Sequence, residues 1–285
     1  MPSSSPNVFE TISRSYYELT AAERKTADYV MKNRTRTQYL SIGELAEESG
    51  VAEATVSRFC RRLGYKGYSA FKLAIATAGA DNTAAAPENV PQEEDDTISI
   101  ARRLYATENE ALRQTLMLLR TEAVEQAVEI LRGARRVLCM GQGGSMILAS
   151  EAAHLFSICD GKFIPVSDSH LQIIASAALC AEDAVLFFSY SGATRDMMET
   201  LEVVRENGAK IILVTRFPSS PGAALADVVL QCGSNESPLQ HGSVAARIAQ
   251  LFLLDILFAR LCQLEPDAYQ SNRRRIISAL ADKHL

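Results

Sequence analysis

Five short apolar runs, spread over the second half of the chain, are the feature that most restricts its fold. They are RVLCMG (136–141), KFIPV (162–166), AVLFFS (184–189), KIILVT (210–215) and DVVLQC (227–232). Stretches with helical periodicity separate the first four runs, at 145–158, 170–180 and 194–207. Strands that alternate with helices predict a parallel sheet with helices on both of its faces.

The first part of the chain has a different pattern, a run of short helices over residues 20–78. Thr20 with Glu23, and Ser41 with Glu44, have the spacing of a capping box, which marks the start of a helix. Residues 79–96 are small, contain proline and end in an acidic run, which is typical of a linker. The predicted parts are an all-α domain (1–78), this linker (79–96), and an α/β domain with flanking helices (97–285).

The segment IGELAEESGVAEATVSRFCR (42–61) fits a helix-turn-helix position by position. Ala46 is small where a bulky side chain would force the two helices apart. Gly50 falls at the turn, which favours a left-handed backbone. Ser49 is the one imperfect match among the apolar positions. The other four are filled by Leu45, Val51, Val56 and Phe59.

The second helix of this motif, residues 53–63, is expected to enter the major groove of DNA. Arg58 suits guanine, and the remaining polar side chains suit bases or phosphates. The alternative is a plain three-helix bundle with a solvated basic face. Residues 1–78 carry 11 Lys and Arg against 8 Asp and Glu, whereas the remainder carries 18 against 26, which agrees with DNA binding by the first part. The side chains expected to contact DNA are Thr55, Ser57, Arg58, Arg61, Arg62 and Lys66.

The first apolar run of the α/β part ends in a glycine-rich loop that leads into a helix, MGQGGSMILASEAAHLF (140–156). Free backbone N–H groups and the helix dipole favour an anion there. A dinucleotide-binding GxGxxG pattern would use Gly141 and Gly143, but its third glycine falls on Met146. We therefore expect no dinucleotide and no other cofactor, and we expect this loop, with Ser145, to hold a phosphate.

The segment FSYSGATRD (188–196) places three hydroxyl side chains after the third apolar run: Ser189, Ser191 and Thr194. Open α/β sheets bind ligands at the carboxyl ends of their strands. Hydroxyls with backbone donors suit a phosphate and nearby sugar hydroxyls. The alternative is that Ser191 or Thr194 only caps the following helix. Ser145 on an adjacent strand end favours the ligand.

The two parts together resemble the RpiR-type bacterial transcription regulators, in which a helix-turn-helix precedes a SIS (sugar isomerase) domain. The resemblance rests on ATVSRFCRRLGYKGYSAFK (54–72), GQGGS (141–145), SDSH (167–170), SYSGAT (189–194) and GSVAARIAQL (242–251). It implies a flavodoxin-like, five-stranded parallel sheet, with a phosphosugar held by Ser145, Ser189, Ser191 and Thr194. It also implies homodimers or homotetramers through the SIS domains, and control of genes for sugar catabolism or transport.

The competing function is a phosphosugar isomerase or lyase of the same fold. Such an enzyme needs a positioned base, usually Glu or His, and His170, Glu236 and His241 follow predicted strands. Each of them can equally hydrogen-bond sugar hydroxyls. Because an isomerase has no need of a helix-turn-helix, we expect a regulator that binds operator DNA and a phosphosugar. We assign these three residues to sugar binding and none to catalysis.

The cysteines and the apolar segments bear on the cellular compartment. None of the six cysteines forms a CxxC or a zinc-spaced cluster, and the first residues do not resemble a signal peptide. The longest apolar stretch, 248–259, is broken by Gln250 and Asp255 and is too short to span a membrane. We expect a cytoplasmic protein without a metal site.

Overall fold

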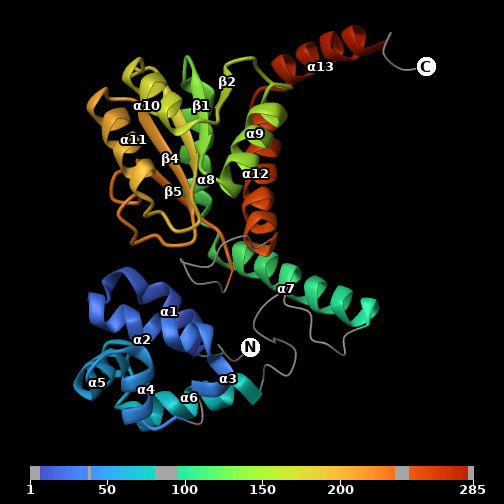
Figure 1. Ribbon diagram of the computed structural model, residues 1–285. Helices are drawn as coiled ribbons and strands as arrows, with labels where there is room; N and C mark the ends of the chain where they lie inside the picture. The colour runs from blue at the N-terminus through green and yellow to red at the C-terminus, as the bar shows by residue number, and fades with distance from the viewer. Residues whose placement is uncertain (1–6, 38–39, 81–95, 235–243, 282–285) are drawn as a thin grey trace. The chain divides into compact units, whose positions relative to one another are not determined.

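The computed structural model describes residues 7–37, 40–80, 96–234 and 244–281 (Figure 1). The described chain divides into two compact units: residues up to Glu110 form unit 1, and those from Ala111 onward form unit 2. Most of the predicted linker, 79–96, lies outside the described residues, so its bounds stay a prediction. Among the described residues, no helix combines the length and the apolar character needed to cross a bilayer.

Unit 1 is helical, as the sequence predicts. Both predicted capping boxes form: the Thr20 backbone N–H donates to Glu23 Oε2 at 2.8 Å, and that of Ser41 to Glu44 Oε2 at 2.6 Å. The elements are α1 Val8–Ser15, a 3-10 turn Tyr16–Glu18, α2 Ala21–Lys32, α3 Arg34–Thr37, α4 Ile42–Ser49, α5 Glu53–Arg62 and α6 Tyr68–Ala80. The next helix, α7 Thr97–Leu118, begins in unit 1 and ends in unit 2.

The core of unit 1 joins its first and last helices to the helix-turn-helix. Phe59 on α5 and Phe71 on α6 are both buried, with ring centroids 5.4 Å apart in an edge-to-face pair. Ile12 on α1 is also buried. No helix was predicted before residue 20, although Phe9 and Ile12 in α1 show the helical spacing of a buried face.

Unit 2 alternates strands and helices, and every predicted strand is present. Its strands are β1 Val137–Gly141, β2 Phe163–Val166, β3 Ala184–Phe188, β4 Lys210–Thr215 and β5 Val228–Gln231. Its helices are α8 Thr121–Gly133, α9 Gly144–Phe156, α10 Ser169–Ala177, α11 Arg195–Glu206, α12 Val244–Leu264 and α13 Pro266–Leu280.

The five strands form one parallel sheet in the order β2-β1-β3-β4-β5. Alternate residues of each strand pack against opposite helical layers. Cys139 and Leu186 belong to the core with α8, α9 and α12, whereas Met140 and Phe187 belong to the core with α11. Figure 1 shows α10 and α11 on one side of the sheet and α9 and α12 on the other. Burial on both faces explains why the strands read as continuous apolar runs.

The order of the strands creates a switch point between β1 and β3. Gly141, the last residue of β1, pairs with Phe188, the last residue of β3, so both strands end at the same level. From there β2 lies to one side and β4 to the other. Crevices at such switch points, outside the carboxyl ends of the strands, are the usual ligand sites of open α/β sheets.

Candidate functional site

The glycine-rich loop between β1 and α9 is tightly folded. A Cβ atom on Gly141 would lie 2.5 Å from the Ser145 carbonyl oxygen, so the first turn of α9 packs against this position only because it is glycine. The backbone N–H groups of Gly143 and Gly144 donate to no acceptor within the described part of the chain. These two N–H groups are therefore available to an anion, whereas the next two, of Ser145 and Met146, donate to the carbonyls of Gln142 and Gly143.

The hydroxyl loop after β3 is held partly by its own side chains. The buried Ser189 Oγ accepts from the Gly192 N–H at 3.1 Å, and Ser191 Oγ accepts from the Ala193 N–H at 3.4 Å. Gly192 has a φ of 61°, and a Cβ there would lie 2.2 Å from Ser220 Oγ. Two of the predicted phosphate ligands therefore also fix the shape of the loop that presents them.

The two loops meet across the β1–β3 switch point. Thr194 precedes α11 but makes no capping bond with its side chain. Its hydroxyl instead donates to Gln142 Oε1 at 3.0 Å. The buried Gln142 Nε2 has no acceptor among the described residues. Gln142 was not among the predicted site residues, although its place between two loop glycines is a signal that could have identified it.

Gln172 on α10 fixes the ends of the two neighbouring strands. This fully buried side chain donates from Nε2 to the carbonyl oxygens of Gly141 and Val166, both at 2.8 Å. Asp168 caps the same helix by accepting from the Leu171 N–H at 2.9 Å. Within the segment SDSH the carboxylate is therefore a helix cap.

The predicted sugar-binding residues are only partly visible. His170 is exposed in the first turn of α10. Glu236 and His241 lie outside the described residues, so their roles stay predictions. The structure brings the three hydroxyls of 189–194, Gly141 and Gly143, and Ser145 to adjacent strand ends, as expected.

A cation that the sequence analysis missed lies against the glycine-rich loop. Arg247 on α12 is half-buried, and its Nη1 lies 3.4 Å from the position that a Cβ on Gly144 would occupy. In the described part of the chain this guanidinium has neither a hydrogen bond nor an ion pair. More than 100 residues separate it from the loop in sequence, so no local motif could have placed it there.

The helix-turn-helix of unit 1 forms with the predicted packing. Gly50 has φ 64° and ψ 43°, the left-handed conformation that the turn requires. Ala46, Leu45, Val56 and Phe59 are buried. Ser49 is the one polar residue at a usually apolar position of the motif. It is tolerated in the core because its hydroxyl donates to the Leu45 carbonyl at 2.5 Å.

The predicted DNA-contacting side chains differ in their surroundings. Arg58, Arg61 and Lys66 are exposed. Thr55 is buried, and its Oγ1 accepts from Arg58 Nη2 at 3.3 Å, while Ser57 is half-buried.

Arg62 lies on the same helix but is engaged within the unit. Its Nε donates to Glu23 Oε1 at 3.3 Å and its Nη1 donates to the Glu18 carbonyl at 3.1 Å. Burial acts to raise the pKa of Glu23, but hydrogen bonds from Thr20 and the charge of Arg62 outweigh it, and the pKa is lowered.

These features define a class of protein: a helix-turn-helix unit joined to an α/β unit with a polar site at its strand ends. Comparison with known proteins makes the class specific. The helix-turn-helix domain of the rpiR family matches residues 6–82, and the SIS domain matches residues 130–260. An HTH-type transcriptional regulator of Haemophilus influenzae, itself uncharacterized, is 31% identical over 99% of both chains. The chain belongs to the RpiR family of transcriptional regulators, with an N-terminal helix-turn-helix and a C-terminal SIS domain.

Two further similarities bear on function. The HTH-type transcriptional regulator HexR of Pseudomonas aeruginosa is 30% identical over 96% of this chain and 95% of its own. Among solved structures, the Vibrio vulnificus NanR protein complexed with ManNAc-6P matches with a TM-score of 0.63 and 25% identity. That match covers 98% of this chain and 99% of NanR. These relatives are transcriptional regulators, although enzymes with the SIS fold also exist.

Proposed function

We propose that this protein controls transcription by binding a phosphosugar in unit 2, and that this binding changes the affinity of the helix-turn-helix for operator DNA. The observation that carries the proposal is the bond between Thr194 and Gln142, which joins the two polar loops at the switch point. The structural similarity to a NanR protein complexed with ManNAc-6P supports it.

In this proposal the phosphate lies between the two loops. The N–H groups of Gly143 and Gly144 and the hydroxyls of Ser145 and Ser191 donate to its oxygens. Ser189 holds the loop in shape, and Thr194, whose hydroxyl donates to Gln142, joins the two loops beside the phosphate. Arg247 supplies the positive charge that hydroxyls and amides lack. The predicted sugar contacts are His170, Glu236 and His241.

In the proposed complex with DNA, α5 is the recognition helix that enters the major groove. Arg58 contacts bases, and the hydrogen bond that it donates to Thr55 Oγ1 orients its side chain. Arg61 and Lys66 contact phosphates. Ser57 stays a predicted contact. Arg62, which is bound to Glu23, contributes to the stability of unit 1 in addition to any phosphate contact.

The assembly and the target genes also belong to the proposal. Exposed apolar side chains lie on α9 and α10, namely Ile147 (62% exposed), Leu171 (54%) and Ile174 (64%), and they suit a contact between SIS domains of a homo-oligomer. Phosphosugar sensing suits genes of sugar catabolism or transport. The effector acts only through its different affinities for the DNA-binding and non-binding arrangements.

The first experiment is a thermal-shift screen with hexose, pentose and amino-sugar phosphates, each beside its unphosphorylated form. A ligand that binds only the folded state raises the melting temperature by mass action. We expect a rise with one or more phosphosugars and none with their unphosphorylated forms. Equal shifts with and without the phosphate would contradict a phosphate site.

The second experiment measures operator binding by fluorescence anisotropy, on a fragment that the protein itself selects from genomic DNA. We expect the stabilising phosphosugar to change the DNA affinity of the wild-type protein. Ser189→Ala combined with Ser191→Ala should remove this response while leaving DNA binding intact. Ser157→Ala, at the far end of α9, is the matched control and should respond like the wild type.

A further inference from the structure

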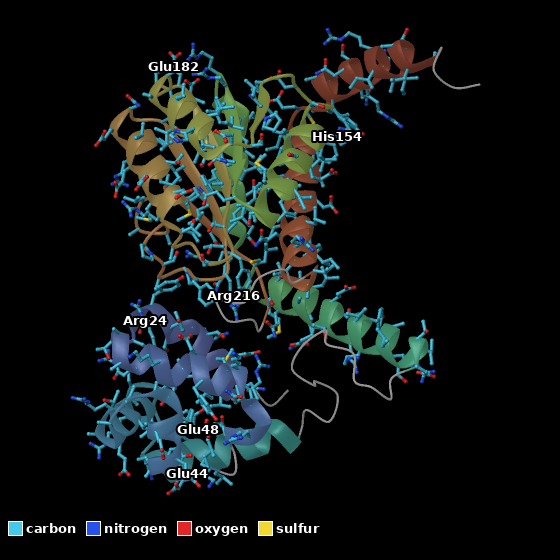
Figure 2. The ribbon with its side chains drawn as sticks, in the orientation of Figure 1. Arg24, Glu44, Glu48, His154, Glu182 and Arg216 are labelled. Carbon is cyan, nitrogen blue, oxygen red and sulfur yellow. The ribbon has the colours of Figure 1, made fainter. Side chains whose placement is uncertain are left out.

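Two cysteines that are far apart in sequence lie in contact at the ends of two helices of unit 2. The Cys159 Sγ atom lies 3.3 Å from the Cys262 Sγ atom. Cys159 follows α9, whose C-terminal end is marked by His154 in Figure 2, and Cys262 lies in the last turn of α12. Both thiols are free. Because 103 positions separate them in sequence, no local motif could indicate this pair.

The contact between the two thiols is the last in a regular alignment of α9 with α12. At the start of the two helices, Arg247 Nη1 lies 3.4 Å from the position that a Cβ on Gly144 would occupy. Near their ends, the rings of Phe156 and Phe258 have centroids 6.0 Å apart. The two helices therefore run in the same direction and in register. The packing of the whole helix pair, and not the conformation of one side chain, brings the two sulfur atoms together.

The backbone of Cys159 is held from two sides. Its N–H donates to the Phe156 carbonyl at 2.9 Å, and its carbonyl accepts from Asn272 Nδ2 on α13. A disulfide bond holds its two sulfur atoms about 2.05 Å apart, so an approach of about 1 Å between the two thiols is enough to form one. The fold therefore places the pair close to the geometry of a disulfide.

The two thiols differ in exposure and in acidity. Cys159 is 4% exposed, and burial raises the pKa of its thiol to about 12. Cys262 is half-buried. Burial also raises the pKa of the Cys262 thiol, but the hydrogen bond from Cys159 acts in the opposite direction. Because the thiolate is the reactive form of cysteine, Cys262 is the thiol that an oxidant reaches first.

We propose that Cys159 and Cys262 form a redox site, which hydrogen peroxide converts reversibly into a disulfide. In the first step the Cys262 sulfur attacks one peroxide oxygen, the O–O bond breaks, and a sulfenic acid and one water are formed. In the second step the Cys159 sulfur attacks the Cys262 sulfur, the S–O bond breaks, and a second water leaves. Two electrons pass from the two thiols to one peroxide, and a thiol reductant returns them by exchange.

The disulfide should stabilise the folded protein. It closes a loop of roughly 100 residues, which restricts the unfolded chain, and it joins two helices that are already packed in register. We expect the oxidised protein to unfold at a temperature about 5 °C or more above that of the reduced protein. This inference does not depend on the phosphosugar site, so either proposal can fail without the other.

The test uses the full-length protein before and after treatment with hydrogen peroxide. Thiols are counted with Ellman's reagent in denaturant, and unreduced peptides are mapped by mass spectrometry. We expect all six cysteines to react before treatment and four after it, with one linked pair of peptides that carries Cys159 and Cys262. Dithiothreitol should restore the six thiols. Six thiols after treatment, a bond between any other two cysteines, or sulfinic acid on Cys262 without a linked peptide would overturn the proposal.

Two variants connect the change in stability to this pair. Cys262→Ser alters a half-buried position and should fold, but it should give no linked peptides and no rise in melting temperature with peroxide. Cys180→Ser is the matched control, because Cys180 is also half-buried but contacts Arg135 and Asp183 and not a second thiol. It should respond as the wild type does. A rise of equal size in Cys262→Ser, or an oxidised wild type that melts no higher than the reduced one, contradicts the proposal.

Discussion

The two edges of the sheet in unit 2 use charge in opposite ways. At the amino edge, Asp183 precedes β3 with its side chain fully buried, and it is paired with Arg135 at 2.9 Å and with Arg136 at 3.2 Å. At the carboxyl edge, the buried Arg216, which directly follows β4, and Arg247 have no carboxylate partner among the described residues. Figure 2 shows the two edges, with Glu182, the neighbour of Asp183, at one and Arg216 at the other.

This difference indicates that the charges at the amino edge contribute to stability, whereas those at the carboxyl edge are available for ligand binding. The charges at the amino edge pair with one another and hold the strand ends together, although the buried Arg136 Nε has no partner among the described residues. Polar groups at the carboxyl edge are positioned by the fold but incompletely satisfied by it, which costs stability unless a ligand completes them. The position of the arginines without a carboxylate partner, and not the number of polar residues, indicates the site.

The largest expected effect is at the amino edge. Asp183→Asn removes the buried carboxylate that pairs with two partly exposed arginines and should lower the free energy of unfolding by about 1.5–3 kcal/mol. Urea denaturation measures this loss. The matched control is Asp227→Asn, because Asp227 pairs with Lys210 but its side chain is 34% exposed, and it should cost less than half as much. Phosphosugar affinity should change less than twofold in Asp183→Asn, and a large loss of affinity there would erase the contrast between the edges.

Arg247→Gln tests the carboxyl edge. Loss of a charge-assisted contact should weaken phosphosugar binding by about 10- to 100-fold, which is about 1.4–2.8 kcal/mol, with little change in stability. Arg260→Gln is the control, since Arg260 lies on the same helix but pairs with Glu125. Titration calorimetry of both variants decides the matter. If Arg247→Gln binds as the wild type does, Arg247 has no part in the phosphate site.

The pH dependence of stability should also trace to the amino edge. Burial acts to raise the pKa of Asp183, but hydrogen bonds from Arg135, the Cys180 N–H and Arg136 outweigh it and lower the pKa to about 2. Because the pKa of Asp183 is lower in the folded state, its ionised carboxylate stabilises the folded protein at pH values above the ordinary pKa of about 3.9. This contribution, about 2 kcal/mol, is lost as the pH falls toward 2. Asp183→Asn should therefore unfold with a shallower acid dependence than the wild type in denaturation between pH 5 and 2. Parallel curves would contradict this origin.

The smallest expected effects concern two arginines of α5, one of which should act on DNA binding and the other on protein stability. Arg58→Ala should weaken operator binding by at least about 1 kcal/mol without affecting phosphosugar binding. Arg62→Ala should act mainly on stability, because it leaves the buried Glu23 without its cation. Anisotropy on operator DNA and thermal unfolding, applied to both variants, measure the two effects. Equal losses of DNA affinity would show that the contact with Glu23 does not restrict Arg62.

Much of this architecture could be predicted from the sequence because it is encoded locally. The five strands follow from apolar runs, the capping boxes from residues three apart, and the turn from Gly50. The loops of 141–145 and 189–194 could be placed at one edge because strand ends of a parallel sheet coincide.

Features that depend on tertiary contacts could not be predicted in this way. The packing of Arg247 against Gly144 and the burial of Arg216 depend on residues that are distant in sequence. The pairing of Arg62 with Glu23 does so too, since nothing in the basic pattern of α5 distinguishes Arg62 from Arg61. Glu236 and His241 lie outside the described residues and remain predictions.

The central claim is that the joined loops at the β1–β3 switch point bind a phosphate. The most direct measurement is the dissociation constant of the most stabilising phosphosugar, determined by titration calorimetry for the wild type and for Ser189→Ala with Ser191→Ala. We expect at least about 30-fold weaker binding in the variant, since the Ser191 hydroxyl contact and the Ser189 bond that shapes the loop are both lost. Equal dissociation constants in the two proteins would contradict the claim and move the phosphate away from these loops.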